Sequence, residues 1–161
     1  PKVVEQVTKA VRKVTDKPVI VKLSPNVTDI VEIAKAVEAG GGNGVSLINT
    51  LLGMAIDIHR RKPLLGNIYG GLSGPAVKPV ALRMVHQVYK GVTIPIIGLG
   101  GIMSGTDAIE FMMAGAQAVQ VGTATMVDPT AISRIAREMG DYVERYNLNS
   151  ITDIIGAVHQ S

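Results

Sequence analysis

Two short apolar runs that end in glycine are the first candidates for chemistry. They lie at residues 94–102 (IPIIGLGGI) and 118–124 (AVQVGTA), and their composition is typical of strands buried on both faces of a parallel sheet. Because glycine lacks a Cβ, the backbone N–H groups at Gly101 and Gly122 can approach an anion closely. A (β/α)8 barrel holds phosphate in this way between its last two strands. The pattern favours a phosphate site with Thr123 as a hydroxyl donor; the alternative is that the glycines only form tight turns.

Polar side chains follow two earlier apolar runs. Lys22 lies near the end of the run at 19–23, where a buried charge is costly unless it has a partner. Asn49 and Thr50 directly follow the run at 44–48 and offer a donor, an acceptor and a hydroxyl. Because barrel active sites lie at the carboxyl ends of the strands, we predict a functional role for Lys22 rather than an ammonium that only reaches solvent. The Asn-Thr pair suits a ring with amide and carboxylate groups, although a capped turn is the simpler interpretation of the pair alone.

Helices are expected between these strands. Ser104 and Asp107 predict a capped start for the helix that Gly115 ends, and Thr28 is the expected cap of an earlier helix. The first expected helix, 3–14, carries a stripe of valines, and the second runs from 28 to the glycines at 40–42. A third begins at Pro79, a fourth spans 104–115, and a fifth spans 130–146 after the start signal Asp128-Pro129. A short docking helix is expected at 150–161.

The segment 51–70 is long for a loop between a strand and a helix. A solvated loop is the simpler interpretation, and a lid or a partner-contacting segment is the alternative. His59 lies in this segment, but no acid or nucleophile that pairs with it is evident, so it is not assigned as a general base.

Composition limits the class of protein. The chain has 161 residues, 47% of them hydrophobic, with one Phe and no Trp, which predicts one domain over residues 1–161 with an aliphatic core. The formal net charge of +3 is small and the basic residues lack interleaved aromatics, so nucleic-acid binding has no support. The absence of cysteine excludes disulfides and thiolate metal ligands, and no metal site is predicted. No targeting or membrane-spanning segment is recognised, and we expect a cytoplasmic protein.

The number of strands bounds the fold. A complete (β/α)8 barrel needs about 250 residues, and only four strong strands are found here. We therefore predict an α/β fold that forms the C-terminal half of a (β/α)8 barrel, with the N-terminal half outside this chain.

Five motifs in the same order resemble the dihydroorotate dehydrogenase family, over nearly the whole chain. They are VKLSPN at 21–26, INT at 48–50, GGLSGPA at 70–76, PIIGLGGI at 95–102 and AVQVGTA at 118–124. The GLSGPA form is similar to the NAD-linked class 1B catalytic subunits rather than to the fumarate-linked or quinone-linked classes.

The resemblance implies an enzyme that oxidises dihydroorotate to orotate, with FMN as the hydride acceptor. It implies that Lys22 contacts the flavin near its pyrimidine edge, where a cation stabilises the reduced ring. It further implies flavin contacts at Ile48 and Gly74, phosphate contacts at Gly100, Gly101, Gly122 and Thr123, and substrate contacts at Asn49 and Thr50.

The resemblance also implies partners. A separate subunit carrying FAD and a 2Fe-2S cluster passes electrons to NAD, and the catalytic subunit forms a homodimer within a heterotetramer. The general base of this class is a cysteine in the first half of the barrel. This chain has no cysteine, so no catalytic residue is predicted in it and the fragment alone is expected to be inactive.

Two alternatives stay open at this point. One is another FMN barrel, of the dihydropyrimidine or dihydrouridine reductase type. The other is a half-barrel without catalysis that binds phosphate or self-associates.

Overall fold

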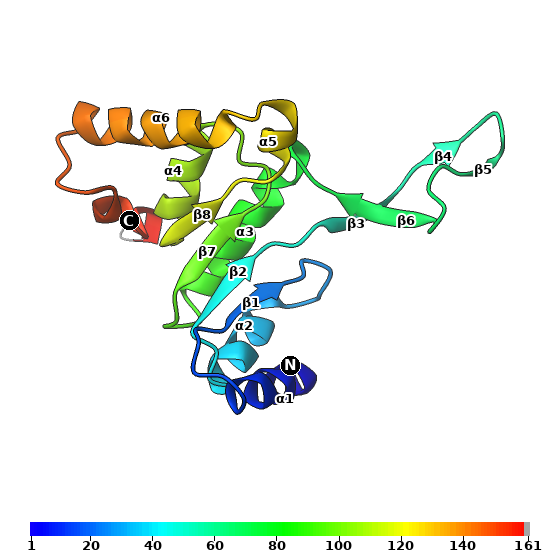
Figure 1. Ribbon diagram of the computed structural model, residues 1–161, viewed down its shortest axis with the longest axis horizontal. Helices are drawn as coiled ribbons and strands as arrows, with labels where there is room; N and C mark the ends of the chain where they lie inside the picture. Colours follow the sequence, from blue (N-terminus) through cyan, green and yellow to red (C-terminus); the bar gives the residue numbers. More distant parts are fainter. Residues whose placement is uncertain (160–161) are drawn as a thin grey trace.

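A four-stranded parallel sheet forms the centre of the computed structural model, which describes residues 1–159 (Figure 1). The strands lie in the order β1 (Ile20–Leu23), β2 (Gly44–Leu47), β7 (Ile96–Leu99) and β8 (Ala118–Gln120). Lys22 is in register with Ser46, and Ser46 with Ile97. Because all four strands run in the same direction, their carboxyl ends meet at one edge of the sheet.

Helices cover one face of this sheet. They are α1 (Lys2–Arg12), α2 (Ile30–Ala39), α3 (Lys78–Tyr89) after the 3-10 turn η1 (Pro75–Val77), α4 (Gly105–Met113) and α6 (Ala131–Arg145). The core between the helices and the sheet is aliphatic apart from Phe111, whose ring packs under Gly98. Alternating strands and helices around half of a barrel sheet confirm the predicted fold class.

The other face of the sheet has no layer over it within residues 1–159. Ile20 at the start of β1 is 51% exposed, and Lys22, Ala118 and Gln120 on the same face are exposed as well. The expectation that the runs at 94–102 and 118–124 are buried on both faces is therefore wrong for β8, and in β7 the residues on this face, Ile97 and Leu99, are only half-buried. In a closed barrel this face is the interior, which side chains from all eight strands fill.

Local capping explains where two of the helices begin. Ser104 and Asp107 form the predicted capping box of α4, and Gly115 follows that helix with a positive φ of 117°. The predicted cap of α2 was wrong by one residue: the carboxylate of Asp29, not Thr28, accepts the N–H groups of Val31 and Glu32.

Two further helix predictions need correction, α3 in its first residue and α1 in the side that packs. α3 begins at Lys78 rather than Pro79, because proline is accommodated in the first turn. In α1, most of the valine stripe faces outward: Val3 and Val7 are exposed and only Val4 packs against the core, whereas Thr8 is buried and closely approaches Gly40 after α2. The side of α1 that packs is therefore narrower than the stripe suggested.

The chain after β8 differs from the expectation. The helix α5 (Thr123–Val127) begins directly after Gly122, where the sequence predicted only a turn before the helix at 130. The tail forms two 3-10 turns, η2 (Ile151–Ile154) and η3 (Ala157–His159), instead of one helix. The last two residues of that predicted helix, 160–161, lie outside the described part.

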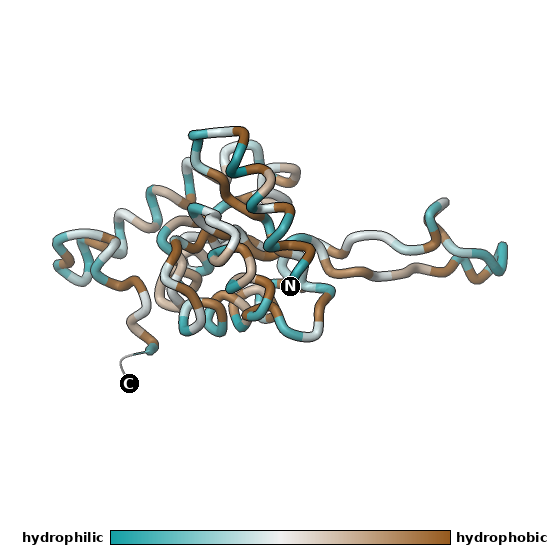
Figure 2. Tube along the Cα trace, turned by 90° about the horizontal axis from the view of Figure 1, so that it is seen from below, coloured by the Kyte–Doolittle hydropathy of each residue, from teal (hydrophilic) through white to brown (hydrophobic). Residues whose placement is uncertain are grey.

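The segment 51–70 is not an irregular loop but a two-stranded arm. β3 (Leu51–Met54) pairs antiparallel with β6 (Tyr69–Leu72), and β4 (Ile56–Asp57) pairs with β5 (Lys62–Pro63) near the tip. The arm projects away from the sheet and its helices (Figure 1). Apolar residues continue along it (Figure 2), and Leu52, Ile56 and Ile58 are all more than half exposed.

Candidate functional site

A cavity of about 820 Å³ opens at the carboxyl ends of the four parallel strands. Every residue that the sequence singled out for a ligand lies in its lining: Lys22, Ile48, Asn49, Thr50, Gly74, Gly100, Gly101, Gly122 and Thr123. They come from four strand ends and from the turn before α3, so segments as far apart in sequence as β1 and α5 meet here. The structure thus brings the predicted set together, while the role of each residue stays a prediction.

The glycine turns lie at one end of the cavity. Gly74 and Gly101 have positive φ values of 86° and 78°, which favour glycine. A Cβ on Gly101 would lie 2.7 Å from the carbonyl oxygen of Gly74, so the two turns are pressed together. A Cβ on Gly122 would meet nothing within 4 Å, because that residue faces the open cavity.

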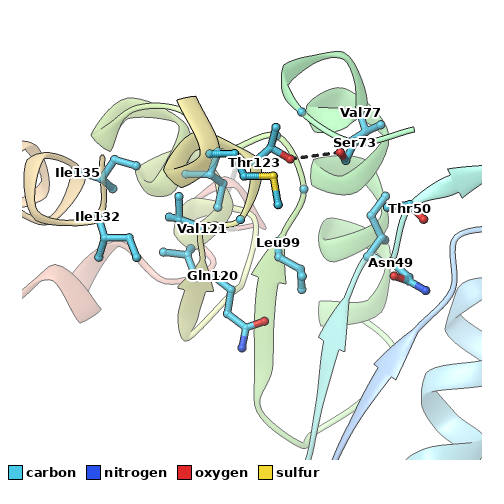
Figure 3. A pocket seen from close by; sticks show the side chains of 18 of the residues that line it. Asn49, Thr50, Ser73, Val77, Leu99, Gln120, Val121, Thr123, Ile132 and Ile135 are labelled. Atoms are coloured by element: carbon cyan, nitrogen blue, oxygen red, sulfur yellow. Dashed lines mark hydrogen bonds between the residues drawn. The ribbon is translucent and has the colours of Figure 1, made fainter. Parts of the chain in front are cut away.

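This end of the cavity has the donors that an anion needs. Within residues 1–159, the backbone N–H groups of Gly101, Gly122 and Thr123 have no protein acceptor. The hydroxyl of Thr123 donates to the hydroxyl of Ser73 at 3.2 Å (Figure 3). Unpaired N–H groups beside glycines without obstructing side chains suit a phosphate.

The other end of the cavity holds the polar residues of β1 and β2. The N–H of Asn49 donates to the carbonyl of Leu23 at 2.9 Å, and the N–H of Ile48 donates to Leu99 at 2.9 Å. These bonds extend the sheet past the end of β2 and hold Asn49 beside β1. The side chain of Lys22 is exposed and its ammonium has no ion-pair or hydrogen-bond partner in the described chain, so the expected burial of its charge was wrong.

The apolar wall of the cavity was missed by the sequence analysis. Met126 comes from α5, and Ile132, Ile135 and Met139 come from α6. The helical period of α6 was the available signal, since Ile132, Ile135 and Met139 are spaced three and four residues apart. Ser73 was also not assigned, although it lies inside the glycine-rich motif before α3.

An ion cluster stands behind the glycine turns. The Nζ of Lys78 lies 2.6 Å from Oδ1 of Asp107 and 2.8 Å from Oε2 of Glu110. Burial raises the pKa of Asp107, but hydrogen bonds from Lys78 and from the N–H of Met103 outweigh this, and the pKa ends below its ordinary value. The same bonds to Asp107 and Glu110 raise the pKa of Lys78, so the charges are retained at neutral pH.

Titratable groups are scarce at the cavity itself. Lys22 is the one ionisable side chain among the lining residues of the described chain. His59 is in the turn between β4 and β5, near the tip of the arm, where its N–H donates to the carboxylate of Asp57 at 3.0 Å. No group of three or more His, Cys, Asp or Glu residues within 1–159 could hold a metal ion.

Fold and cavity together define a class of protein: half of a (β/α)8 barrel with one cavity at the carboxyl ends of the strands, glycine turns at one end of it and polar side chains at the other. Residues 1–143 match the dihydroorotate dehydrogenase family, and the chain belongs to this family.

Curated relatives agree with the family and its NAD-linked class. The chain is 63% identical over 156 residues to the dihydroorotate dehydrogenase B (NAD(+)) catalytic subunit of Alkaliphilus oremlandii, covering 97% of this chain and 52% of the relative. It is also 63% identical over 158 residues to the same-named subunit of Geobacter metallireducens, covering 98% of this chain and 52% of that protein. The chain therefore spans about half the length of the curated relatives it matches.

Proposed function

We propose that this chain is the flavin-phosphate and substrate half-site of a dihydroorotate dehydrogenase, which oxidises dihydroorotate to orotate in pyrimidine biosynthesis. The observation that carries the proposal is the single cavity, which unites all nine predicted ligand residues at the strand ends. Family membership supports this reaction over a dihydropyrimidine or dihydrouridine reductase and over a half-barrel without catalysis.

The residues present fit FMN. Gly122 leaves open space where a side chain would stand, and unpaired N–H groups at Gly101, Gly122 and Thr123 can receive the phosphate. Gly100 and Gly101 shape the first turn, and Gly74 packs against it. When bound, FMN supplies the two-electron acceptor that takes up the hydride from the substrate.

The protein residues at the other end bind and orient. Lys22 would hold the flavin ring and place a positive charge beside it, which favours the reduced, more anionic ring. Ile48 would contact the ring through its backbone, because its side chain is packed in the core and only 3% exposed. Asn49 and Thr50 would hold the amide and carboxylate groups of dihydroorotate, because together they supply donors, an acceptor and a hydroxyl.

The general base is proposed to come from outside this chain. Oxidation of dihydroorotate removes a proton from one carbon and a hydride from its neighbour, and Lys22 is the only ionisable side chain in the described lining. A base must stand within hydrogen-bond reach of the proton that it removes. The chain spans about half of its relatives, and the cysteine that the family resemblance implies belongs to the other half of the barrel.

The partners are proposed from the name of the relatives, which contains the words catalytic subunit and NAD(+). A second subunit with FAD and a 2Fe-2S cluster would carry electrons from FMN to NAD, within a heterotetramer built on a homodimer of catalytic subunits. The exposed apolar residues of the arm give a surface for such contacts, so we favour the partner-contacting interpretation of 51–70 over a lid. Among the described helices, none has the length and hydropathy that crossing a membrane requires; a cytoplasmic location is part of the proposal.

Flavin bleaching tests the proposed function. The full-length enzyme that contains this chain is loaded with FMN, and dihydroorotate is added without oxygen. We expect the flavin absorbance to bleach with dihydroorotate and to stay unchanged with dihydrouracil or dihydrouridine. Bleaching by dihydrouracil or dihydrouridine but not by dihydroorotate would contradict the proposal and favour the reductase alternative.

A further inference from the structure

Asn26 links two strand ends at the polar end of the cavity. It lies in the loop after β1, and its carboxamide reaches the chain that follows β2. Its Nδ2 donates to the carbonyl oxygen of Thr50 at 3.1 Å, and its Oδ1 accepts the N–H of Leu52 at 2.9 Å. One side chain therefore satisfies backbone groups on both sides of Leu51, at the root of the arm.

Thr50 is fixed from a second side by Gly71 of β6. A Cβ on Gly71 would lie 2.6 Å from the Cβ of Thr50, so the threonine side chain occupies the space that the glycine leaves. The ladder between β3 and β6 then begins directly after Thr50, where Leu51 pairs with Leu72. The side chain of Thr50, an exposed residue, thus lies against Gly71, while its carbonyl oxygen is bonded by Asn26.

The neighbouring Asn49 is held by the same part of the chain. Its N–H donates to the carbonyl of Leu23 at 2.9 Å, one residue after Lys22 in β1. The pair Asn49-Thr50 is therefore tied at its start to the end of β1 and at its end to the loop that follows β1. Both ties come from the segment 22–26, which also carries the cation of the cavity.

We infer that Asn26 is a positioning residue for substrate: it holds the Asn49-Thr50 pair in a fixed place relative to Lys22, and so sets how a planar ring with an amide edge and a carboxylate lies against the flavin that Lys22 would hold. This inference rests on the proposed function. Asn26 is not among the residues that line the cavity, so it acts through Thr50 and not by touching the ligand. The glycine turns that would hold phosphate lie at the ends of β7 and β8, outside its reach.

The chain contains a matched control for this role. Asn43 also uses its Oδ1 to accept a backbone N–H, that of Val19, at 2.9 Å. This bond joins the same two strands, β1 and β2, at their amino ends, away from the cavity. N43A removes one side-chain bond between the segments that precede β1 and β2, and N26A removes two between the segments that follow these strands, but only N26A loosens Thr50.

The test is binding of orotate to the FMN-loaded, full-length enzyme, followed by the change in flavin absorbance, with FMN content and thermal unfolding measured on the same samples. We expect N26A to raise the orotate Kd at least tenfold with unchanged FMN content, and N43A to leave that Kd within twofold of wild type. The KM for dihydroorotate should rise in parallel with a smaller change in kcat. An orotate Kd for N26A equal to that of wild type would overturn the inference.

A second variant covers the case in which N26A does not fold. N26D keeps the acceptor for the N–H of Leu52 and loses the donor to Thr50, so a several-fold rise in the orotate Kd is expected and a wild-type value overturns the inference. If N43A weakens orotate binding as much as N26A does, the effect is a general loosening of the sheet, and the positioning role is also overturned. If wild-type enzyme binds FMN but no orotate, the proposed function fails instead, and with it the role built upon it.

Discussion

The ammonium of Lys78 and the carboxylate of Asp107 meet at 2.6 Å directly behind the contact between the two glycine turns. The backbone N of Lys78 would lie 2.9 Å from a Cβ on Gly101, so the ion pair and the glycine contact share one element. Asp107 also accepts the N–H groups of Met103 and Ser104, which follow Gly101. The pair therefore joins the start of α3 to the start of α4 and fixes the shape of the proposed phosphate end.

Replacing Asp107 tests this pair through the pH dependence of stability. D107N should lower the free energy of unfolding at pH 7 by about 1–3 kcal/mol, because it weakens a charge-assisted bond between partly buried groups. The folded pKa of Asp107 is lowered, so its charge stabilises the fold above the unfolded pKa of about 3.9 and this contribution is lost as pH falls through the folded value. Urea unfolding of wild type and D107N from pH 7 to 3 should show a difference that shrinks below about pH 4.

Glu110 supplies the control for that experiment. It contacts the same ammonium at 2.8 Å, but its side chain is 38% exposed against 15% for Asp107. E110Q should therefore cost less than about 1 kcal/mol, since exposed ion pairs contribute little. A D107N deficit that stays constant over the whole pH range would show that the lost charge is not the cause.

Two alanine substitutions distinguish a glycine that leaves space for the ligand from a glycine that the backbone conformation requires. G122A adds a methyl group that meets no protein atom and enters the cavity, so the free energy of unfolding should change by less than about 0.5 kcal/mol. The FMN Kd should rise about tenfold, or about 1.4 kcal/mol, while the affinity for riboflavin, which lacks the phosphate, stays the same. G101A forces a side chain onto a φ of 78° against the carbonyl of Gly74, and should destabilise by about 1–3 kcal/mol.

Fluorescence titration with FMN and with riboflavin, together with thermal unfolding, distinguishes the two effects. Equal FMN affinity in wild type and G122A would remove Gly122 from the phosphate site. From the sequence alone, the two glycines look equivalent, and only the contacts of the folded chain tell them apart.

The Lys22 prediction concerns the reduction potential of the flavin. K22M keeps most of the packing of the side chain but removes the positive charge, so FMN should stay bound through its phosphate and become harder to reduce. Loss of about 1.4 kcal/mol of stabilisation of the reduced ring lowers a two-electron midpoint potential by about 30 mV. Spectroelectrochemical titration measures the shift, and K22R, which keeps a cation, should lie closer to wild type. A K22M potential equal to that of wild type would speak against the role.

Sequence reasoning worked best where local chemistry decides the structure. The apolar runs that end in glycine predicted the strand ends, and Ser104 with Asp107 predicted the start of α4, because capping and turn formation depend on nearby residues. The arm was missed because its strands pair with each other over distance, and β6 is rich in glycine rather than in β-branched residues. The role of Asn26 has no local signal in the sequence, because its bonds to Thr50 and Leu52 span 24 and 26 residues.

The last prediction is that this chain alone does not form orotate. Its described cavity lining offers one ionisable side chain, Lys22, which we assign to the flavin, so no group is left to remove the substrate proton. His59 lies near the tip of an arm that projects away from the sheet, and H59A in the full-length enzyme should leave kcat and KM unchanged (Figure 1).

Complementation completes this test. Adding the remaining half of the barrel from a 63% identical relative should restore orotate formation, measured by absorbance with an artificial electron acceptor. That half would cover the exposed sheet face at Ile20 and supply the base, so replacing its cysteine by alanine should abolish the restored activity. Substantial turnover by the cysteine-free chain alone would place the base within it, and loss of that turnover in H59A would then identify His59.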